Sequence, residues 1–383
     1  MRFLPGIDVL LSQHRHWLKG RRLGLVSHLA AVDARGMTAA ERLWRERAFK
    51  LTALFGPEHG FFGLGGAGET LGHGRHPDWK IPVYSLYGPT RRPTPAMFKN
   101  LDVIVVDLQD LGARCYTYVA TLRYVLELAN ALGKEVVVAD RPIPLPRIVD
   151  GPMRDNALES FVASVNVPMH YGMTPGEMAL WLKAELGLAL PVRVARMQGY
   201  ARAARRGADW PPWIPPSPGI RTWEAGQCYL ATVFSEALSA FDNGRGTSLA
   251  FQVISTPWMK SERVDERLNA LRLPGVAFYA HRYKTAAGAA RAGVRLAVTD
   301  PGIFSPVYTG IAILAGMQEL YGFERIWQAK GSRPDFFDKL YGTATVRQAL
   351  QDGAAPEQIR RSWLKPLKDF ARSRAESLLY PNG

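Results

Sequence analysis

A glutamate and a histidine stand side by side in a glycine-bounded turn early in the chain. The segment LFGPEHGFFG, residues 54–63, places Glu58 and His59 between two glycines, directly after a run of strand-forming residues. From so tight a turn, neither side chain can contribute to an apolar core. Carboxyl and imidazole groups are the side chains that most often transfer protons in enzymes, so this turn is a candidate acid–base site.

Further polar side chains stand where other predicted strands end. They are Ser27, His28, Asp107, Gln109, Asp110, Asp140 and Arg141. The carboxyl ends of parallel strands meet at one edge of a sheet, so we expect these residues to converge there with Glu58. Carboxylates gathered in this way raise one another's pKa, and a carboxyl group that stays protonated near neutral pH serves as a general acid. A polar rim with no catalytic role would show the same pattern.

Hydrophobic periodicity predicts the elements that must position these residues. Apolar runs predict strands over 22–27, 50–55, 81–86, 101–108, 135–140, 161–167 and 191–196. Amphipathic stretches predict helices at about 38–48, 117–132 and 174–186. Strands that alternate with helices favour a mainly parallel sheet with helices on both faces, because parallel strands need long crossover connections. The first part of the chain is therefore predicted to be an α/β domain.

The proline-rich stretch WPPWIPPSPG, residues 210–219, cannot continue a helix or a central strand. We place a domain boundary there, with one domain at 1–218 and a second at 219–383. In the second domain the pattern predicts helices over 224–241, 261–271 and 306–321, strands over 248–255, 276–283 and 293–299, and short helices up to the end. This mixture is typical of a smaller α+β domain.

The composition is strongly basic, with 48 Lys plus Arg against 34 Asp plus Glu and a formal net charge of +14. Such a charge attracts anions. The basic residues are scattered and match no nucleic-acid-binding motif, which favours a generally basic surface over a nucleic-acid-binding protein. No apolar run reaches membrane-spanning length and the first residues do not resemble a signal peptide, which favours a cytoplasmic location without membrane insertion.

One glycine-rich segment resembles a cofactor site. GLGGAG, residues 63–68, matches the dinucleotide-binding pattern, but no helix follows it and no acidic residue ends the next strand. We interpret it as a loop that covers the site. His59, His73 and His76 match no standard spacing of metal ligands. We therefore expect neither a cofactor nor a metal.

Eight blocks occur in an order that resembles the exo-β-N-acetylmuramidases, a family of glycoside hydrolases. They are LFGPEHGFFG, PVYSLYG, DLQDLGARCYTY, ADRPIPL, VDGPM, HYGMTPGEM, PPSPG and NGRGTSLAF. The resemblance implies removal of a terminal β-1,4-linked N-acetylmuramic acid from the non-reducing end of peptidoglycan fragments. It also implies a Rossmann-like N-terminal domain, a smaller C-terminal domain that closes a cleft, and a bacterial source.

The resemblance also implies catalytic roles. Glu58 matches the family's favoured catalytic residue, which would protonate the leaving oxygen. His59 would hydrogen-bond the site or the substrate, or only satisfy the loop backbone. The substrate's own 2-acetamido group could attack the anomeric carbon with Asp107 or Asp110 orienting it, and a direct carboxylate nucleophile is the alternative.

Substrate contacts are implied as well. Arg114 and Arg245 are candidates for binding the lactyl carboxylate of muramic acid through bidentate contacts, or else for forming structural ion pairs. The other candidate contacts are Ser27, Gln109, Tyr116, Tyr118, Asp140, Arg141, Tyr171 and Glu236. The chain departs from the family pattern at Phe62, Ile143 and 237–243, which leaves a related amino sugar as an alternative substrate. A catalytically inactive protein that binds anionic glycans is the alternative function.

Overall fold

The structure is a computed structural model that describes residues 2–63, 65, 66, 68–88 and 90–382. Its N-terminal part is built on a seven-stranded sheet with the order β3-β4-β2-β1-β5-β6-β7. The strands are β1 Arg22–Ser27, β2 Lys50–Gly56, β3 Gly74–Arg75, β4 Pro82–Ser85, β5 Val103–Asp107, β6 Glu135–Ala139 and β7 Val192–Ala195. All neighbouring strands pair in parallel except β3 and β4.

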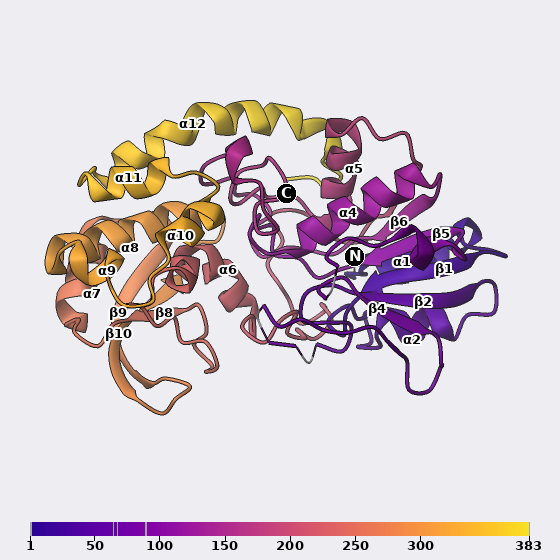
Figure 1. The fold of residues 1–383 in the computed structure, drawn as a ribbon, viewed down its shortest axis with the longest axis horizontal. Coiled ribbons are helices and arrows are strands. Elements are labelled where there is room, and N and C mark those ends of the chain that lie inside the picture. Colours follow the sequence, from indigo (N-terminus) through magenta and orange to yellow (C-terminus); the bar gives the residue numbers. More distant parts are fainter. Residues whose placement is uncertain (1, 64, 67, 89, 383) are drawn as a thin grey trace.

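Helices cover both faces of this sheet (Figure 1). They are α1 Gly6–Gln13, α2 Ala39–Trp44, α3 Pro95–Phe98, α4 Tyr118–Ala131 and α5 Pro175–Glu185. Side chains alternate along the strands, so Leu23 and Leu25 pack with α1 and α2, whereas Val26 packs in the core with α4 and α5. Burial on both faces explains why the central strands read as continuous apolar runs. The predicted α/β fold with a mainly parallel sheet is confirmed.

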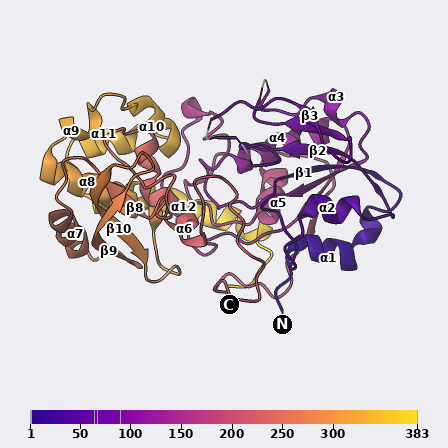
Figure 2. The ribbon, with the colours of Figure 1, turned by 90° about the horizontal axis from the view of Figure 1, so that it is seen from below.

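The C-terminal part contains a smaller antiparallel sheet of β8 Val253–Ser255, β10 Ala290–Val298 and β9 Val276–Lys284, in that order. Its helices are α6 Trp223–Thr232, α7 Ser261–Ala270, α8 Pro306–Tyr321, α9 Glu324–Trp327, α10 Pro334–Tyr341, α11 Thr345–Gln351 and α12 Pro356–Ser373. The sheets lie at opposite ends of the molecule, with α12 running between its two parts (Figures 1 and 2). None of the described helices is both long and apolar enough to cross a bilayer.

Three local predictions are wrong. Residues 161–167, predicted as a strand, form turns, and Val165 and Val167 are buried in the core from an irregular segment. Only Val253–Ser255 of the predicted strand at 248–255 is extended, because the preceding residues form turns. The predicted short C-terminal helices include one of 18 residues, α12. Apolar runs alone do not distinguish a strand from a buried irregular segment.

Candidate active site

The turn that carries Glu58 has a constrained backbone. β2 ends at Gly56, and a Cβ at this position would lie 2.2 Å from the backbone nitrogen of Phe61, so only glycine fits. His59 follows with φ +71°, in the left-handed region that residues other than glycine seldom adopt. Its Nδ1 lies 3.0 Å from the carbonyl oxygen of Gly65. Such conformations persist only where the surrounding contacts enforce them, often at functional sites.

Both carboxyl oxygens of Glu58 accept hydrogen bonds. The Thr117 hydroxyl donates to Oε2 over 2.6 Å, and the backbone N–H of Gly68 donates to Oε1 over 3.0 Å. Gly68 belongs to the predicted covering loop at 63–68, in which Leu64 and Ala67 lie outside the described residues. A hydroxyl can donate or accept, so Thr117 suits the charged and the protonated form of Glu58. The carboxyl group is thus fixed in direction in either state.

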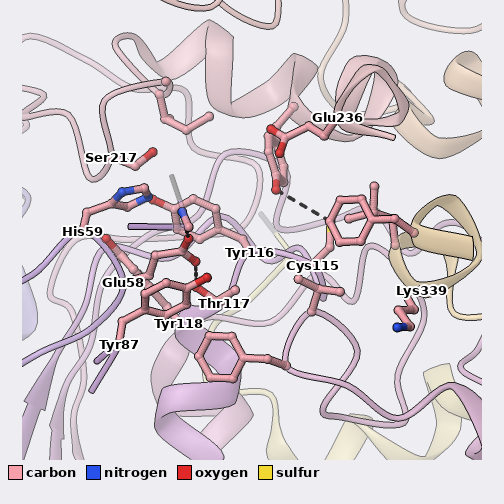
Figure 3. A pocket seen from close by; sticks show the side chains of 18 of the residues that line it. Glu58, His59, Tyr87, Cys115, Tyr116, Thr117, Tyr118, Ser217, Glu236 and Lys339 are labelled. Atoms are coloured by element: carbon pink, nitrogen blue, oxygen red, sulfur yellow. Dashed lines mark hydrogen bonds between the residues drawn. The ribbon is translucent and has the colours of Figure 1, made fainter. Parts of the chain in front are cut away.

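A cavity of about 570 Å³ opens beside this turn, a size usual for small-molecule sites (Figure 3). Its lining comes from both parts of the molecule. The N-terminal part contributes Glu58, His59, Arg91, Tyr116, Thr117 and Tyr118, among others. The C-terminal part contributes Tyr229, Glu236, Arg245, Arg333, Phe336 and Lys339, among others. Of the predicted site residues, the structure therefore brings six together: Glu58, His59, Tyr116, Tyr118, Glu236 and Arg245.

Glu236 supplies a second carboxylate to the same cavity. It ends a short 3₁₀ helix, Val233–Glu236, and its side chain forms an ion pair with Arg245. Arg333 donates to the Glu236 carbonyl oxygen over 2.6 Å, which fixes the backbone. Burial raises the pKa of Glu236, Arg245 opposes that rise, and the negative charge of Glu58 adds to it. The two glutamates therefore interact electrostatically across one cavity.

Aromatic rings form much of the remaining wall. The ring centroids of Tyr116 and Tyr118 lie 4.7 Å apart, and those of Tyr116 and Tyr229 lie 5.8 Å apart. Tyr118 donates its hydroxyl to the carbonyl oxygen of Pro216 over 2.5 Å. The buried hydroxyl of Tyr116 has no hydrogen-bond partner among the described residues. Tyr116 therefore contributes its ring to the cavity wall rather than an accessible hydroxyl.

The other predicted residues at the sheet edge lie outside the cavity lining that the described residues form. Asp107 and Arg141 make a buried, two-pronged ion pair, with Nη2 and Oδ2 3.0 Å apart. Gln109 donates from Nε2 to the Pro142 carbonyl oxygen over 2.8 Å. Ser27 is buried beside them. The polar groups of Asp107, Arg141 and Gln109 thus have partners within the protein, away from the cavity.

Asp110, Tyr171 and Asp140 are also buried structural groups. The Tyr171 hydroxyl donates to Asp110 over 3.0 Å, and Asp110 also accepts from the backbone N–H groups of Leu111 and Gly112. Asp140 accepts from the Thr174 hydroxyl, the Gly176 backbone N–H and the Tyr380 hydroxyl. Burial raises the pKa of Asp110 to about 6, and burial with the nearby Glu177 raises that of Asp140 to about 7. The raised pKa values of Asp110 and Asp140 therefore accompany hydrogen bonds that stabilise the fold.

Arg114 is completely buried and connects segments of both parts of the chain. Its guanidinium donates to the carbonyl oxygens of Pro152 and Val167, over 3.0 and 2.7 Å. It also donates to the carbonyl oxygens of Leu340 and Tyr341, which close α10. Burial lowers the pKa of Arg114 to about 10, so the group stays charged at neutral pH. These contacts support a structural role for Arg114 rather than a role in substrate binding.

Replacing Arg114 with methionine is therefore expected to cost about 3 kcal/mol of unfolding free energy, because four carbonyl oxygens lose a charged donor. Urea denaturation measures the loss. Arg45→Met, which removes an exposed arginine paired with Glu41 on α2, is the matched control and should change stability far less. An Arg114→Met protein with unchanged stability and weakened sugar binding would restore the substrate role.

Sequence reasoning missed several lining residues. Thr117 stands between Tyr116 and Tyr118, two candidate substrate contacts, but a threonine beside a helix start usually indicates a helix cap. Arg91 follows β4, and Arg333 and Lys339 belong to the region of α10. Nothing in their local sequence indicates that they face Glu58, since they lie far from it along the chain. Among the described residues, no group of histidine, cysteine and carboxylate side chains could hold a metal ion.

Two carboxylates and several aromatic rings around one sugar-sized cavity, at the edge of an α/β sheet, are the features that a glycoside hydrolase site requires. The model for the N-terminal domain of the exo-β-N-acetylmuramidase NamZ matches residues 23–224, and the model for its C-terminal domain matches residues 227–380. The chain belongs to the exo-β-N-acetylmuramidase NamZ family. The family resemblance inferred from the eight sequence blocks is thereby confirmed.

Individual relatives agree with this assignment. The chain is 36% identical over 380 residues to the peptidoglycan β-N-acetylmuramidase NamZ of Bacillus subtilis strain 168, covering 98% of this chain and 91% of that protein. A crystal structure of a DUF1343 family protein from Bacteroides fragilis superposes with a TM-score of 0.91 and 32% identity, covering 99% of each chain. A second such protein from the same organism, at 24% identity and a TM-score of 0.79, shares the fold over 100% of each chain.

Proposed function

We propose that the protein removes a terminal β-1,4-linked N-acetylmuramic acid from the non-reducing end of peptidoglycan fragments. The observation that carries this proposal is the position of Glu58, the family's glutamate, with its carboxyl group at the wall of a sugar-sized cavity. The cavity lining supports an anionic sugar. Among the described residues it holds four basic side chains, Arg91, Arg245, Arg333 and Lys339, against two carboxylates.

In this mechanism Glu58 is the general acid. Its proton passes to the glycosidic oxygen as the bond to the anomeric carbon breaks. Thr117 accepts a hydrogen bond from the protonated acid and then donates one to the carboxylate that remains, and the Gly68 N–H holds the other oxygen throughout. The acid therefore keeps its direction while its charge changes. His59 supports the turn through its contact with Gly65.

Glu236 is proposed as the second carboxylate. Asp107 and Asp110, the candidates from the sequence, are buried in contacts of their own, whereas Glu236 lines the cavity with Glu58. Its carboxylate acts on the anomeric carbon, or orients the 2-acetamido group or a water molecule that does so. The ion pair with Arg245 opposes the burial-driven rise in the pKa of Glu236 and so favours its ionised form.

We further propose that the division at 218/219 separates a catalytic domain from a C-terminal domain that closes the cleft. Glu58 and Thr117 come from the first of these parts and Glu236 from the second, so neither part alone forms the cavity. A cytoplasmic location, suggested by the sequence alone, is part of the same proposal.

The proposal is tested by release of para-nitrophenol from the β-glycosides of N-acetylmuramic acid and N-acetylglucosamine. We expect release from the muramic acid derivative at a rate at least about tenfold above that from the glucosamine derivative, as a charge-assisted contact provides. Equal rates would contradict the anionic specificity. Tight binding of N-acetylmuramic acid without any release would instead support the inactive glycan-binding protein.

A further inference from the structure

The helix α10 directs its basic residues at the cavity. Arg333, which precedes the helix, and Phe336, Lys339 and Leu340 all line the cavity, and their spacing of three to four residues is that of one helix face. The acidic Asp338 is buried elsewhere and pairs with Arg347, with Oδ2 and Nη2 2.7 Å apart. The other acidic residue of α10, Asp335, is exposed, lies outside the cavity lining and forms no ion pair with another described residue. The α10 face at the cavity therefore carries a positive charge that no ion pair within this helix neutralises.

Lys339 differs from the other basic residues of the lining. Arg245 pairs with Glu236, and Arg333 donates to the carbonyl oxygen of Glu236 and lies 4.5 Å from the Phe336 ring centroid. Arg91 lies 4.8 Å from the ring centroids of both Tyr87 and Phe161. For the Lys339 ammonium, the part of the chain that the structure describes provides no ion pair and no hydrogen bond. Figure 3 shows Lys339 on the C-terminal side of the cavity, away from Glu58 and His59.

The position of Lys339 is fixed by the core. Its neighbours Phe337 and Tyr341 are buried, and their rings stack with centroids 4.2 Å apart. The last carbonyl groups of α10 bind the guanidinium of Arg114, and Gly342 ends the helix in the left-handed conformation with φ +72°. The backbone at Lys339 is thus anchored, and the exposed lysine side chain reaches the cavity wall from it.

We propose that Lys339, with Arg333 beside it, binds a carboxylate group that the substrate carries outside its pyranose ring. This inference rests on the proposed function and assigns the anion contact to α10 instead of Arg114. An ammonium group without an internal partner gains most from an anionic ligand, because no existing ion pair must break. Two sources of the carboxylate share this chemistry: the lactyl group of the terminal sugar, and a peptide attached to that group. Lys339 would then determine which sugars are accepted.

Calorimetric titration with free N-acetylmuramic acid and with its uncharged methyl ester tests the proposal without any turnover. We expect the wild-type protein to bind the acid about tenfold more tightly than the ester, as a charged hydrogen bond provides. Lys339→Met should abolish this preference by weakening only the binding of the acid, and Lys339→Arg should retain most of it. Lys368→Met, which removes an exposed lysine from α12, is the matched control and should behave like wild type.

N-acetylmuramyl-L-alanyl-D-isoglutamine distinguishes the two sources, because its lactyl group is an amide and its only carboxylate lies on the peptide. Weaker binding of N-acetylmuramic acid by Lys339→Met identifies the lactyl group, and weaker binding of the muramyl peptide alone identifies the peptide. Equal losses for the acid and the ester, or no loss on any ligand, would overturn the proposal. Failure of the proposed function would give a different result. The wild-type protein would then still bind N-acetylmuramic acid more tightly than its methyl ester but would hydrolyse no muramide.

Discussion

Glu58→Gln is expected to lower kcat on the disaccharide N-acetylmuramyl-β-1,4-N-acetylglucosamine by roughly 10²- to 10⁴-fold, the usual contribution of a general acid. The amide keeps the shape of the side chain: its oxygen can still accept from the Gly68 N–H and its NH2 group can donate to the Thr117 hydroxyl, but it has no acidic proton to deliver. The unprotonated sugar alkoxide is a poor leaving group, so the loss should appear in kcat. Binding of N-acetylmuramic acid and the thermal midpoint should change little.

Glu69→Gln provides the matched control for this variant. Glu69 lies in the same loop region, is exposed, and accepts a hydrogen bond from the Gly66 backbone N–H over 2.6 Å. The same chemical exchange at this position should leave kcat near the wild-type value. A wild-type kcat in Glu58→Gln would show that Glu58 is not the general acid. A comparable loss of kcat in both variants would indicate disturbance of the loop.

Glu236→Gln is expected to lower kcat by roughly 10²- to 10³-fold, within the range for a group that acts at the reacting centre. The amide carries no charge to stabilise the developing positive charge at the anomeric carbon. It also leaves the guanidinium of Arg245 without its carboxylate partner. The rate of the disaccharide reaction, measured at saturating substrate, gives the size of the loss. A loss below tenfold would favour attack by the 2-acetamido group without help from Glu236.

The pH dependence provides an independent measurement of the same role. Glu236 must be ionised to act, and its pKa is raised above the ordinary value of 4.5 by burial. Activity should therefore fall as pH decreases through that raised pKa, on a limb that lies above pH 4.5. Because Arg245 opposes the rise, Arg245→Met should move the limb to higher pH. An acid limb that stays in place in Arg245→Met would contradict the assignment.

The fold could be predicted largely from the sequence because its signals are local. Strands β1, β2, β5 and β6 are largely buried apolar runs, and β4 and β7 are partly buried ones. Helix α5 lies where the sequence predicts it and begins with a cap in which the Thr174 hydroxyl accepts from the N–H of Glu177. The segment 161–167 has equal apolar content but no neighbouring strand to pair with along its length. A strand depends on its partner, which the local sequence does not specify.

The site could be predicted only in part. The carboxyl ends of the strands did indicate the correct edge of the sheet, and Glu58 lies there at the cavity wall. The rule that ligands bind at the carboxyl ends of parallel strands does not say which polar side chains there lack a partner inside the protein. Asp107 is occupied by Arg141, 34 positions later in the sequence, and Asp140 by Tyr380 at the end of the chain. Lys339 reaches the cavity only because α10 packs against a segment more than 200 positions earlier, through Arg114.

The dependence of the Glu58→Gln defect on the leaving group tests most directly whether Glu58 delivers a proton to the glycosidic oxygen. The rates of wild type and variant should be compared on N-acetylmuramides that carry 2,4-dinitrophenol, which leaves without protonation, and on the natural disaccharide, which requires it. We predict a large defect on the disaccharide and a defect below about tenfold on the dinitrophenyl glycoside, since general acid catalysis is lost only where it is needed. Equal defects on both substrates would contradict the role of Glu58 as the acid.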